Sequence, residues 1–287
     1  MDVRSVGVVG AGTMGSGIVQ VFAASGYDVT LTDVSPQQLE RARASAAAGL
    51  ERLVKKGTLS AEQRQAALGR IRTSSELGAV AGCALVIEAA SENLTLKLEL
   101  FRQLDALLSP EALLASNTSS ISITRLAAAT RRPGRVLGMH FFNPVPVMGL
   151  VELVRGRQTD ETAFAAAEAI VRKIGKTPVR VRNSPGFVVN RMLCPMINEA
   201  IFLLAEGVAS AEQIDDAMKL GANHPIGPLA LCDLIGLDVE LAVMQVLYEE
   251  FRDPKYRPAP LLVEMVEAGL LGRKTGRGFY EYRAPTG

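Results

Sequence analysis

Short apolar segments alternate with longer segments of helical periodicity through the first part of the chain. The apolar segments, predicted as strands, lie at residues 3–9, 28–32, 84–88, 113–116, 135–140, 150–154 and 178–181. This alternation is typical of βαβ units, in which helices cover a parallel sheet. An Ala-, Arg- and Gln-rich segment at about 35–69, broken at 55–57, predicts a helical hairpin inserted into one crossover. We therefore expect an α/β fold with a Rossmann-type, mostly parallel sheet.

The sequence Asn183-Ser184-Pro185-Gly186 predicts a domain boundary, because adjacent Pro and Gly interrupt regular structure. Beyond it the pattern is helical. We expect one helix at 187–205, which contains Pro195, and a second that begins at the capping box of Ser210 and Gln213. A long helical segment at 229–251, interrupted at Gly236, and a last helix that ends near Gly269 follow. We expect a Rossmann-type domain at 1–183 and an all-helical domain at 184–287. The helical domain is strongly apolar for its size, so we expect it to form a homodimer.

Charge and cysteine content limit the possible functions. The 31 Lys and Arg balance 30 Asp and Glu, which argues against a nucleic-acid or anionic-membrane surface. Cys83, Cys194 and Cys232 are odd in number and widely spaced, which favours neither a disulfide framework nor a metal site. No apolar run is long enough to span a membrane, and we expect no targeting segment. A cytoplasmic protein with a small-molecule or protein partner is the expectation.

A glycine loop follows the first predicted strand and opens a helical segment. It consists of Gly10, Ala11, Gly12, Thr13, Met14 and Gly15. In a GxGxxG loop the first glycine allows the tight turn, the second lets the backbone approach a pyrophosphate, and the third brings the helix close to the strand. The helix N-terminus then offers free amide donors to the phosphates. The loop predicts a dinucleotide site.

Asp33 ends the second predicted strand, about 20 residues beyond the loop. A carboxylate there accepts hydrogen bonds from ribose hydroxyls and repels a 2′-phosphate, which predicts NAD over NADP. The alternative is that Asp33 is an ordinary helix N-cap before Pro36.

The chain has two histidines, His140 and His224. His140 ends a predicted strand, where ligands of α/β sheets bind, whereas His224 precedes a proline in a turn. Oxidation of an alcohol by hydride transfer needs a base, and histidine is the usual choice near neutral pH. Glu152 lies in the next strand and would face His140 if the two strands are antiparallel about Pro146. The spacing alone equally allows the two side chains to be unrelated in space.

The chain as a whole resembles the L-3-hydroxyacyl-CoA dehydrogenases, in particular the bacterial type that acts on 3-hydroxybutyryl-CoA. The similarity runs in order from near residue 5 to near residue 282. It is carried by GAGTMGSGI, ALVIEAASENLTLK, LASNTSSISI, GMHFFNPVPVMGLVEL, NSPGFVVNR, GANHPIGPLALCDLIGLD and GRKTGRGFY. The resemblance implies NAD as cofactor and a 3-hydroxyacyl-CoA or 3-ketoacyl-CoA as substrate.

The resemblance also implies roles for individual residues. His140 is implied as the catalytic base, Glu152 as its orienting partner, Ser119 as a hydrogen-bonding group for the substrate C3 oxygen, and Asn190 as a substrate contact that places the site between the domains. Glu92, Lys97, Ser119, Asn143 and Lys274 match positions of the family's NAD site. Lys56 on the hairpin is implied as a contact of the CoA nucleotide. Judged without the resemblance, Glu92, Lys97 and the basic cluster of Arg52, Lys55 and Lys56 are equally well explained as solvated helix faces.

Three alternatives stay open at this stage. The β-hydroxyacid and 6-phosphogluconate dehydrogenases share the glycine loop, but they resemble one another in a catalytic Lys on the first interdomain helix, and residues 187–207 contain none. A non-catalytic or lens-type structural relative would bind NAD without turnover. Within the dehydrogenases, a 3-hydroxyadipyl-CoA enzyme of aromatic-acid degradation is the alternative, since small pocket differences decide the acyl chain.

Overall fold

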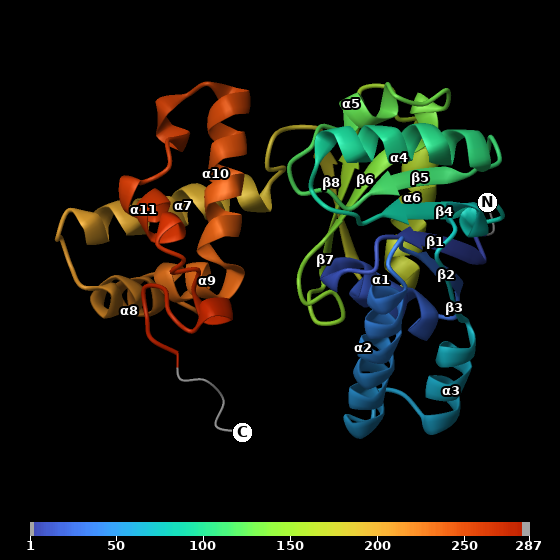
Figure 1. Ribbon diagram of the computed structural model, residues 1–287, viewed down its shortest axis with the longest axis horizontal. Coiled ribbons are helices and arrows are strands. Elements are labelled where there is room, and N and C mark those ends of the chain that lie inside the picture. Colours follow the sequence, from blue (N-terminus) through green and yellow to red (C-terminus); the bar gives the residue numbers. More distant parts are fainter. Residues whose placement is uncertain (1–2, 283–287) are drawn as a thin grey trace. The chain divides into compact units, whose positions relative to one another are not determined.

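The computed structural model describes residues 3–282 and divides into two compact units. The first unit ends at Ser184 and the second begins at Pro185. Figure 1 shows sheet and helices in the first unit and helices in the second. The expected fold class, a mostly parallel α/β sheet followed by an all-helical domain, is therefore confirmed.

One sheet of eight strands organises the described part of the first unit, in the order β3-β2-β1-β4-β5-β6-β7-β8. The strands are β1 Ser5–Val9, β2 Asp28–Thr32, β3 Ile71–Ser74, β4 Leu85–Glu88, β5 Leu113–Ser116, β6 Val136–Phe141, β7 Leu150–Arg155 and β8 Thr177–Arg182. All neighbours pair in parallel except β6 and β7, which are antiparallel. The chain reverses strand order between β1 and β4, which makes their carboxyl ends the expected ligand crevice.

Seven of these strands match the predicted segments, and β3 was missed. Its sequence Ile-Arg-Thr-Ser buries Ile71 alone, because β3 lies at the edge of the sheet and pairs only with β2. An edge strand needs no apolar run, so periodicity did not reveal it.

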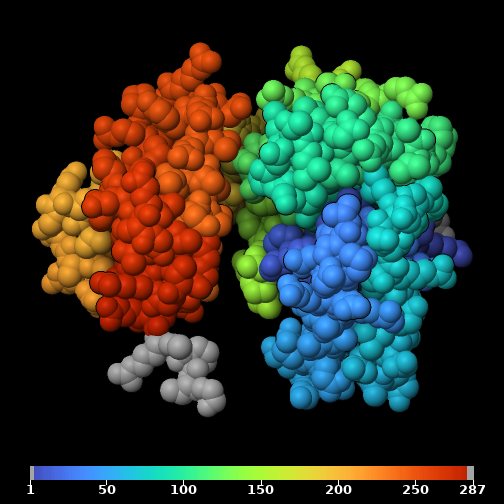
Figure 2. All heavy atoms as spheres, viewed as in Figure 1, coloured from blue at the N-terminus to red at the C-terminus, as the bar shows by residue number. Residues whose placement is uncertain are grey.

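Helices cover both faces of the sheet. They are α1 Thr13–Ala24, α2 Pro36–Lys55, α3 Ala61–Gly69, α4 Leu94–Leu107, α5 Ile123–Ala127 and α6 Glu161–Lys173. The helices α2 and α3 form a hairpin, which projects beyond the sheet in blue to cyan in Figures 1 and 2. Ser60 begins α3 with a capping box completed by Gln63.

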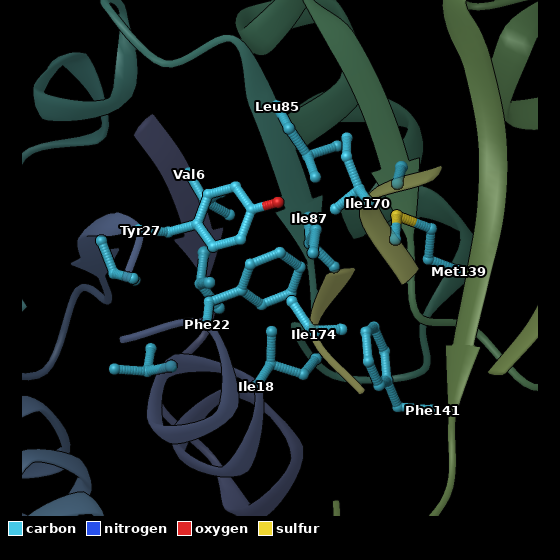
Figure 3. Packing of buried hydrophobic residues seen from close by; sticks show 14 of the residues in the cluster. Val6, Ile18, Phe22, Tyr27, Leu85, Ile87, Met139, Phe141, Ile170 and Ile174 are labelled. Atoms are coloured by element: carbon cyan, nitrogen blue, oxygen red, sulfur yellow. The ribbon is translucent and has the colours of Figure 1, made fainter. Parts of the chain in front are cut away.

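The main core lies between the sheet and the helices α1 and α6. Residues of alternate positions along β4 and β5, such as Leu85, Ile87 and Leu113, belong to this cluster, as the two-residue period of a strand requires. Phe22 of α1 packs edge-on against Tyr27 and Phe141, with ring centroids 5.3 and 6.4 Å apart (Figure 3). Glu88 ends β4 and Ser116 ends β5. Both lie one position away from these core residues, so they face the other side of the sheet.

Helices of the second unit are α7 Val189–Ala205, α8 Ala211–Gly221, α9 Pro228–Ile235, α10 Leu237–Phe251 and α11 Pro260–Glu267. Pro195 lies inside α7, and Ser210 with Gln213 forms the expected capping box. The predicted segment at 229–251 is two helices, because Gly236 adopts a φ of +106°, which breaks the helix and which L side chains rarely adopt. After α11 the described chain contributes isolated bridges at Gly272, Arg277 and Glu281, but no strand. No helix among residues 3–282 combines the length and the apolar character needed to cross a bilayer.

Candidate active site

The glycine loop joins β1 to α1 and shows a different physical reason for each glycine. Gly10 has a φ of +105°, and a Cβ there would lie 2.6 Å from the carbonyl oxygen of Ala89. A Cβ on Gly15 would lie 1.8 Å from the carbonyl oxygen of Gly10, so the protein itself excludes a side chain. A Cβ on Gly12 would meet no protein atom within 4 Å. Packing does not demand glycine at position 12, whereas a phosphate approaching the α1 amides does.

A cleft of about 600 Å³ opens in front of this loop. Its walls come from the carboxyl ends of neighbouring parallel strands. Gly10, Gly12, Thr13 and Met14 of the loop line it together with Thr32, Asp33 and Val34 after β2, Ala89, Ala90 and Ser91 after β4, and Leu96 and Leu100 of α4. These residues fit a dinucleotide, because the lining includes both the first residues of α1, whose amides can bind phosphates, and the Asp33 carboxylate, which can bind a ribose.

Asp33 holds the loop as well as lining the cleft. One of its carboxylate oxygens accepts a hydrogen bond from the Ala11 amide at 2.8 Å, and the other accepts from the Ser35 amide at 2.9 Å. The helix N-cap is Ser35, whose hydroxyl accepts from the Gln38 amide. The alternative of Asp33 as the N-cap of α2 is therefore wrong, and the carboxylate keeps further lone pairs for ribose hydroxyls.

A buried charge cluster follows β4. Lys97 Nζ of α4 lies 2.5 Å from Glu88 Oε1 and 3.2 Å from Glu92 Oε2. Glu88 and Lys97 are 0% and 1% exposed. Burial by itself raises the pKa of Glu92, but the Lys97 charge and hydrogen bonds from neighbours including Thr118 prevail and hold that pKa below its ordinary value. The solvated-face alternative for Lys97 is excluded by its burial.

Ser119 lies in the loop after β5, which is folded around Glu92. Glu92 Oε1 accepts hydrogen bonds from the amides of Ser119 and Ser120 at 3.1 and 3.3 Å, and from the Thr118 hydroxyl. Asn117, at the start of this loop, receives the Phe141 amide of β6 on its side-chain oxygen at 2.9 Å. The structure thus brings Ser119, Glu92 and Lys97 together at the ends of β4 and β5.

His140 and Glu152 occupy opposed positions of the antiparallel pair β6 and β7. His140 Nδ1 lies 2.7 Å from Glu152 Oε2, and the two residues are 6% and 0% exposed. An ionised carboxylate only accepts, so Nδ1 carries the hydrogen in this pair and Nε2 is the nitrogen that can exchange a proton. The sequence left open whether the two strands are antiparallel; they are, so the alternative that the two side chains are unrelated in space is wrong.

Comparison with known proteins shows to which family the chain belongs. Residues 5–184 match the family described as 3-hydroxyacyl-CoA dehydrogenase, NAD binding domain, and residues 186–282 match 3-hydroxyacyl-CoA dehydrogenase, C-terminal domain. The chain belongs to the 3-hydroxyacyl-CoA dehydrogenase family. Its first unit is the NAD-binding domain of such an enzyme, and the alternative of the 6-phosphogluconate dehydrogenase group is set aside.

Individual relatives agree over nearly the whole chain. A 3-hydroxybutyryl-CoA dehydrogenase of Bradyrhizobium diazoefficiens is 55% identical over 98% of this chain and 96% of its own length. The crystal structure of (S)-3-hydroxybutyryl-CoA dehydrogenase from Ralstonia eutropha is 57% identical, with a TM-score of 0.95 and coverage of 99% and 100% of the two chains. A 3-hydroxyadipyl-CoA dehydrogenase of Escherichia coli is 44% identical over 99% of this chain and 60% of its own length.

A second cleft of the dehydrogenase, about 430 Å³ in volume, shares Gly12 and Thr13 with the first. Asn143 lines this second cleft, not the first, in company with Arg41 and Arg52 of α2. Lys56 is the C-cap residue of α2 and is exposed, outside the residues that line either cleft. Of the basic cluster on the hairpin, the structure therefore brings Arg52 to a cleft.

Asn190 and Lys274 belong to the second unit. Asn190 lies in the first turn of α7 and is half-buried. Lys274 is paired with Asp238 of α10 by a short contact and lies in the 3₁₀ turn Arg273–Thr275. Asp238 partly neutralises the charge of Lys274, which the sequence pattern did not indicate.

Glu88 and Asn117 take part in the site but were missed from the sequence. Glu88 accepts from Lys97 Nζ, the Ala90 amide and the Ser116 hydroxyl, and its own carbonyl accepts the Asn117 amide at 2.7 Å. A signal was present, because Glu88 is an acidic residue ending an apolar strand at the edge where ligands bind. Asp33 was selected because it is an acidic residue at the carboxyl end of a predicted strand, and Glu88 meets the same criterion.

Proposed function

We propose that this chain is an NAD-dependent 3-hydroxybutyryl-CoA dehydrogenase, which interconverts a short L-3-hydroxyacyl-CoA and the 3-ketoacyl-CoA. The observation that carries the proposal is the buried pair of His140 and Glu152. His140 lies near the carboxyl end of β6, at the same edge of the sheet as the cleft in front of Gly12. A base and a dinucleotide site at one edge are the two parts that alcohol oxidation needs. The names of the most similar relatives support the short acyl chain.

In this mechanism Nε2 of His140 accepts the proton of the C3 hydroxyl while the C3–H bond breaks as a hydride. NAD, when bound, supplies the acceptor for that hydride. Glu152 keeps Nδ1 protonated and offsets the positive charge that the ring gains. The Ser119 hydroxyl orients the C3 oxygen, and Asn190 of the second unit contacts the substrate. In reverse, His140 returns the proton to the ketone oxygen as the hydride arrives.

NAD is expected to lie along the first cleft. The amides of Gly12, Thr13 and Met14 at the start of α1 hold the pyrophosphate, because the Ala11 amide already donates to Asp33. Asp33 holds the adenosine ribose, and Glu92 and Lys97 are assigned to the cofactor by family resemblance, with Lys97 donating to the carbonyl of Ala90 in the cleft wall. Asn143 and Lys274 are assigned to the cofactor by family resemblance.

The CoA nucleotide is proposed to bind the hairpin of α2 and α3. Lys56 is the family-implied contact, and Arg52 supports it because it lines the second cleft beside Asn143. Arginine and lysine are suited to phosphate oxygens, which CoA carries.

We also propose a homodimer formed through the second unit. Its surface exposes large apolar side chains, including Met192 at 73% and Leu220 at 86%, and such exposure is typical of a protein interface. The three cysteines are free and buried, which supports location in the reducing cytoplasm. Light scattering after size-exclusion chromatography tests the dimer, and a monomer at micromolar concentration would overturn it.

Initial rates of NADH oxidation with a panel of 3-ketoacyl-CoA esters test the proposed activity. The panel contains acetoacetyl-CoA, a medium-chain ester and the carboxylated 3-ketoadipyl-CoA. We expect the highest kcat/KM with acetoacetyl-CoA. A preference for 3-ketoadipyl-CoA would instead favour the activity named for the Escherichia coli relative. NADH binding without turnover of any ester would identify a non-catalytic relative.

A further inference from the structure

The strand that carries His140 extends beyond its parallel neighbour. β5 ends at Ser116, which lies opposite Gly138 of β6. β6 continues through His140 to Phe141, so its last residues lie beyond the end of β5. On its other side β6 pairs with β7, where His140 is opposed to Glu152. The end of β6 is therefore paired with a strand on one side only.

Asn117 supplies an acceptor on the side that β5 leaves open. Its side-chain oxygen accepts a hydrogen bond from the Phe141 amide at 2.9 Å. Phe141 is 1% exposed, so this amide is shielded from bulk water. A buried amide without an acceptor is costly. The Asn117 side chain thus takes the place of the strand carbonyl that a longer β5 would provide.

The Phe141 amide belongs to the peptide bond that joins His140 to Phe141. By holding this peptide, Asn117 restricts the backbone next to the proposed base. The imidazole itself has two further contacts, since Nδ1 lies 2.7 Å from Glu152 Oε2 and the Phe142 ring packs against it with centroids 4.5 Å apart. Both contacts depend on the course of β6 at its end, because His140 and Phe142 flank the held residue.

Asn117 is itself held by β4. Its own amide donates to the Glu88 carbonyl at 2.7 Å. Ser119 lies two residues further along the same loop, and its amide donates to Glu92 at 3.1 Å. Asn117 therefore links the loop that carries Ser119 to the strand that carries His140.

We propose that Asn117 is a positioning residue of the reaction, whose side-chain oxygen sets the orientation of the His140 imidazole relative to Ser119. It acts through the Phe141 peptide and transfers no proton itself. A general base works only within hydrogen-bond reach of its proton, and a misplacement of about 1 Å costs about 10²-fold in rate. This inference rests on the proposed function, which assigns His140 as the base and Ser119 as the group that orients the C3 oxygen.

Asn117→Leu and Asn117→Asp test the inference as a matched pair. Leucine is close to asparagine in shape but has no acceptor, whereas aspartate keeps an oxygen at the same place. The control is Thr159→Val. Thr159 is also buried, and its hydroxyl donates to the Val136 carbonyl at 2.6 Å, so it holds the opposite end of the same strand.

The first readout is the exchange of the His140 Nδ1 proton with solvent, followed by NMR in protein with isotope-labelled histidine. The chain has two histidines, and the His140→Gln variant identifies the signal. We expect slow exchange in wild type, Asn117→Asp and Thr159→Val. In Asn117→Leu exchange should be about tenfold faster, which corresponds to the net loss of one hydrogen bond.

The second readout is kcat with acetoacetyl-CoA and NADH, together with the Kd for NADH. Asn117→Leu is expected to lower kcat by about 10- to 100-fold. The Kd for NADH should stay within about twofold of wild type, because Asn117 does not line the dinucleotide cleft. Asn117→Asp is expected to retain most of the wild-type kcat. Thr159→Val is expected to lower Tm and leave kcat unchanged.

An unchanged exchange rate or an unchanged kcat in Asn117→Leu overturns the proposal. Equal losses in Asn117→Leu and Asn117→Asp, or in Asn117→Leu and Thr159→Val, also overturn it. If Asn117→Leu does not fold by circular dichroism, Asn117→Ala takes its place with the same expectations. Wild type that turns over no 3-ketoacyl-CoA ester would overturn the proposed function instead, and the exchange measurement, which needs no substrate, would still decide whether Asn117 holds His140.

Discussion

Glu152 receives a hydrogen bond from His140 Nδ1 at 2.7 Å across the antiparallel pair of β6 and β7. The two residues are 12 positions apart in sequence and directly opposed in the ladder. Both are shielded from bulk solvent, with exposed fractions of 6% and 0%. Water therefore competes little for this hydrogen bond, and the imidazole is held in one tautomer.

Replacement of His140 by Gln should remove the base and leave the cofactor site intact. We expect kcat to fall by about 10²- to 10⁴-fold, the usual contribution of a positioned acid–base group. The Kd for NADH should stay within about twofold of wild type, because His140 does not line the dinucleotide cleft. Stopped-flow turnover of acetoacetyl-CoA and fluorescence titration of NADH check the two quantities. Near-normal turnover would refute the assignment of the base.

Replacement of Glu152 by Gln should keep the shape of the pair and remove its charge. A neutral amide offsets the charge of the imidazolium formed on proton uptake much less than a carboxylate does, so we expect kcat to fall by at least about tenfold. Glu161→Gln is a suitable control, because Glu161 is an acid in surface pairs with Arg155 and Arg180. The prediction fails if both variants retain the same turnover.

Alanine at Gly12 and at Gly15 should separate binding from folding. Gly15→Ala places a Cβ 1.8 Å from the Gly10 carbonyl oxygen, so we expect a lower Tm or loss of folded protein. Gly12→Ala meets no protein atom within 4 Å and should fold with an unchanged Tm. It should nevertheless weaken NAD⁺ binding by at least about tenfold, because the methyl group fills the space for the pyrophosphate. Thermal melts and NAD⁺ titration test both, and unweakened binding in Gly12→Ala would contradict the phosphate site.

Asp33→Ser should reduce discrimination against NADP. The substitution removes the charge that repels a 2′-phosphate, and it also removes the acceptor of the Ala11 amide. We expect NAD to lose efficiency, while the ratio of kcat/KM for NAD to that for NADP falls by about tenfold or more. Steady-state kinetics with both cofactors give the ratio. An unchanged ratio would show that Asp33 serves only to hold the loop.

The burial of Glu240 in α10 should make the stability of the folded protein depend on pH. It is fully buried, Cys194 lies beside it, and its two carboxyl oxygens lack a conventional partner among the described residues. Burial raises the pKa of Glu240 from an ordinary 4.5 to about 8. The folded state therefore binds this proton more tightly than the unfolded state, and the resulting stability is lost as pH rises from about 4.5 to about 8.

Glu240→Gln should remove this dependence. We expect the difference in free energy of unfolding between the Glu240→Gln variant and the wild-type protein to shift by up to about 4 kcal/mol in favour of the variant across that pH window. Urea unfolding of both proteins at several pH values between about 5 and 8.5 measures this difference in free energy of unfolding. A constant difference across the range would mean that Glu240 does not change ionisation there.

Local pattern was sufficient for much of this protein. The strand and helix that flank Gly10 to Gly15, the acid at Asp33, and the placing of His140 and Glu152 in adjacent strands were all predictable from the sequence. Each depends on residues close together in the chain, whose periodicity and turn chemistry set local structure directly. The roles of Ser119 and Asn190 came from family resemblance, not from pattern.

Other features were decided by contacts between distant segments. The edge strand β3 has no apolar run, and the Glu88 cluster joins β4, α4 and the loop after β5. Asp33 was predicted to meet a ribose, but only the folded chain brings its carboxylate to the Ala11 amide, 22 residues away. Sequence alone determined which groups were available for the chemistry. The tertiary structure decided which of them are buried together, because burial and hydrogen bonding depend on neighbours that periodicity does not record.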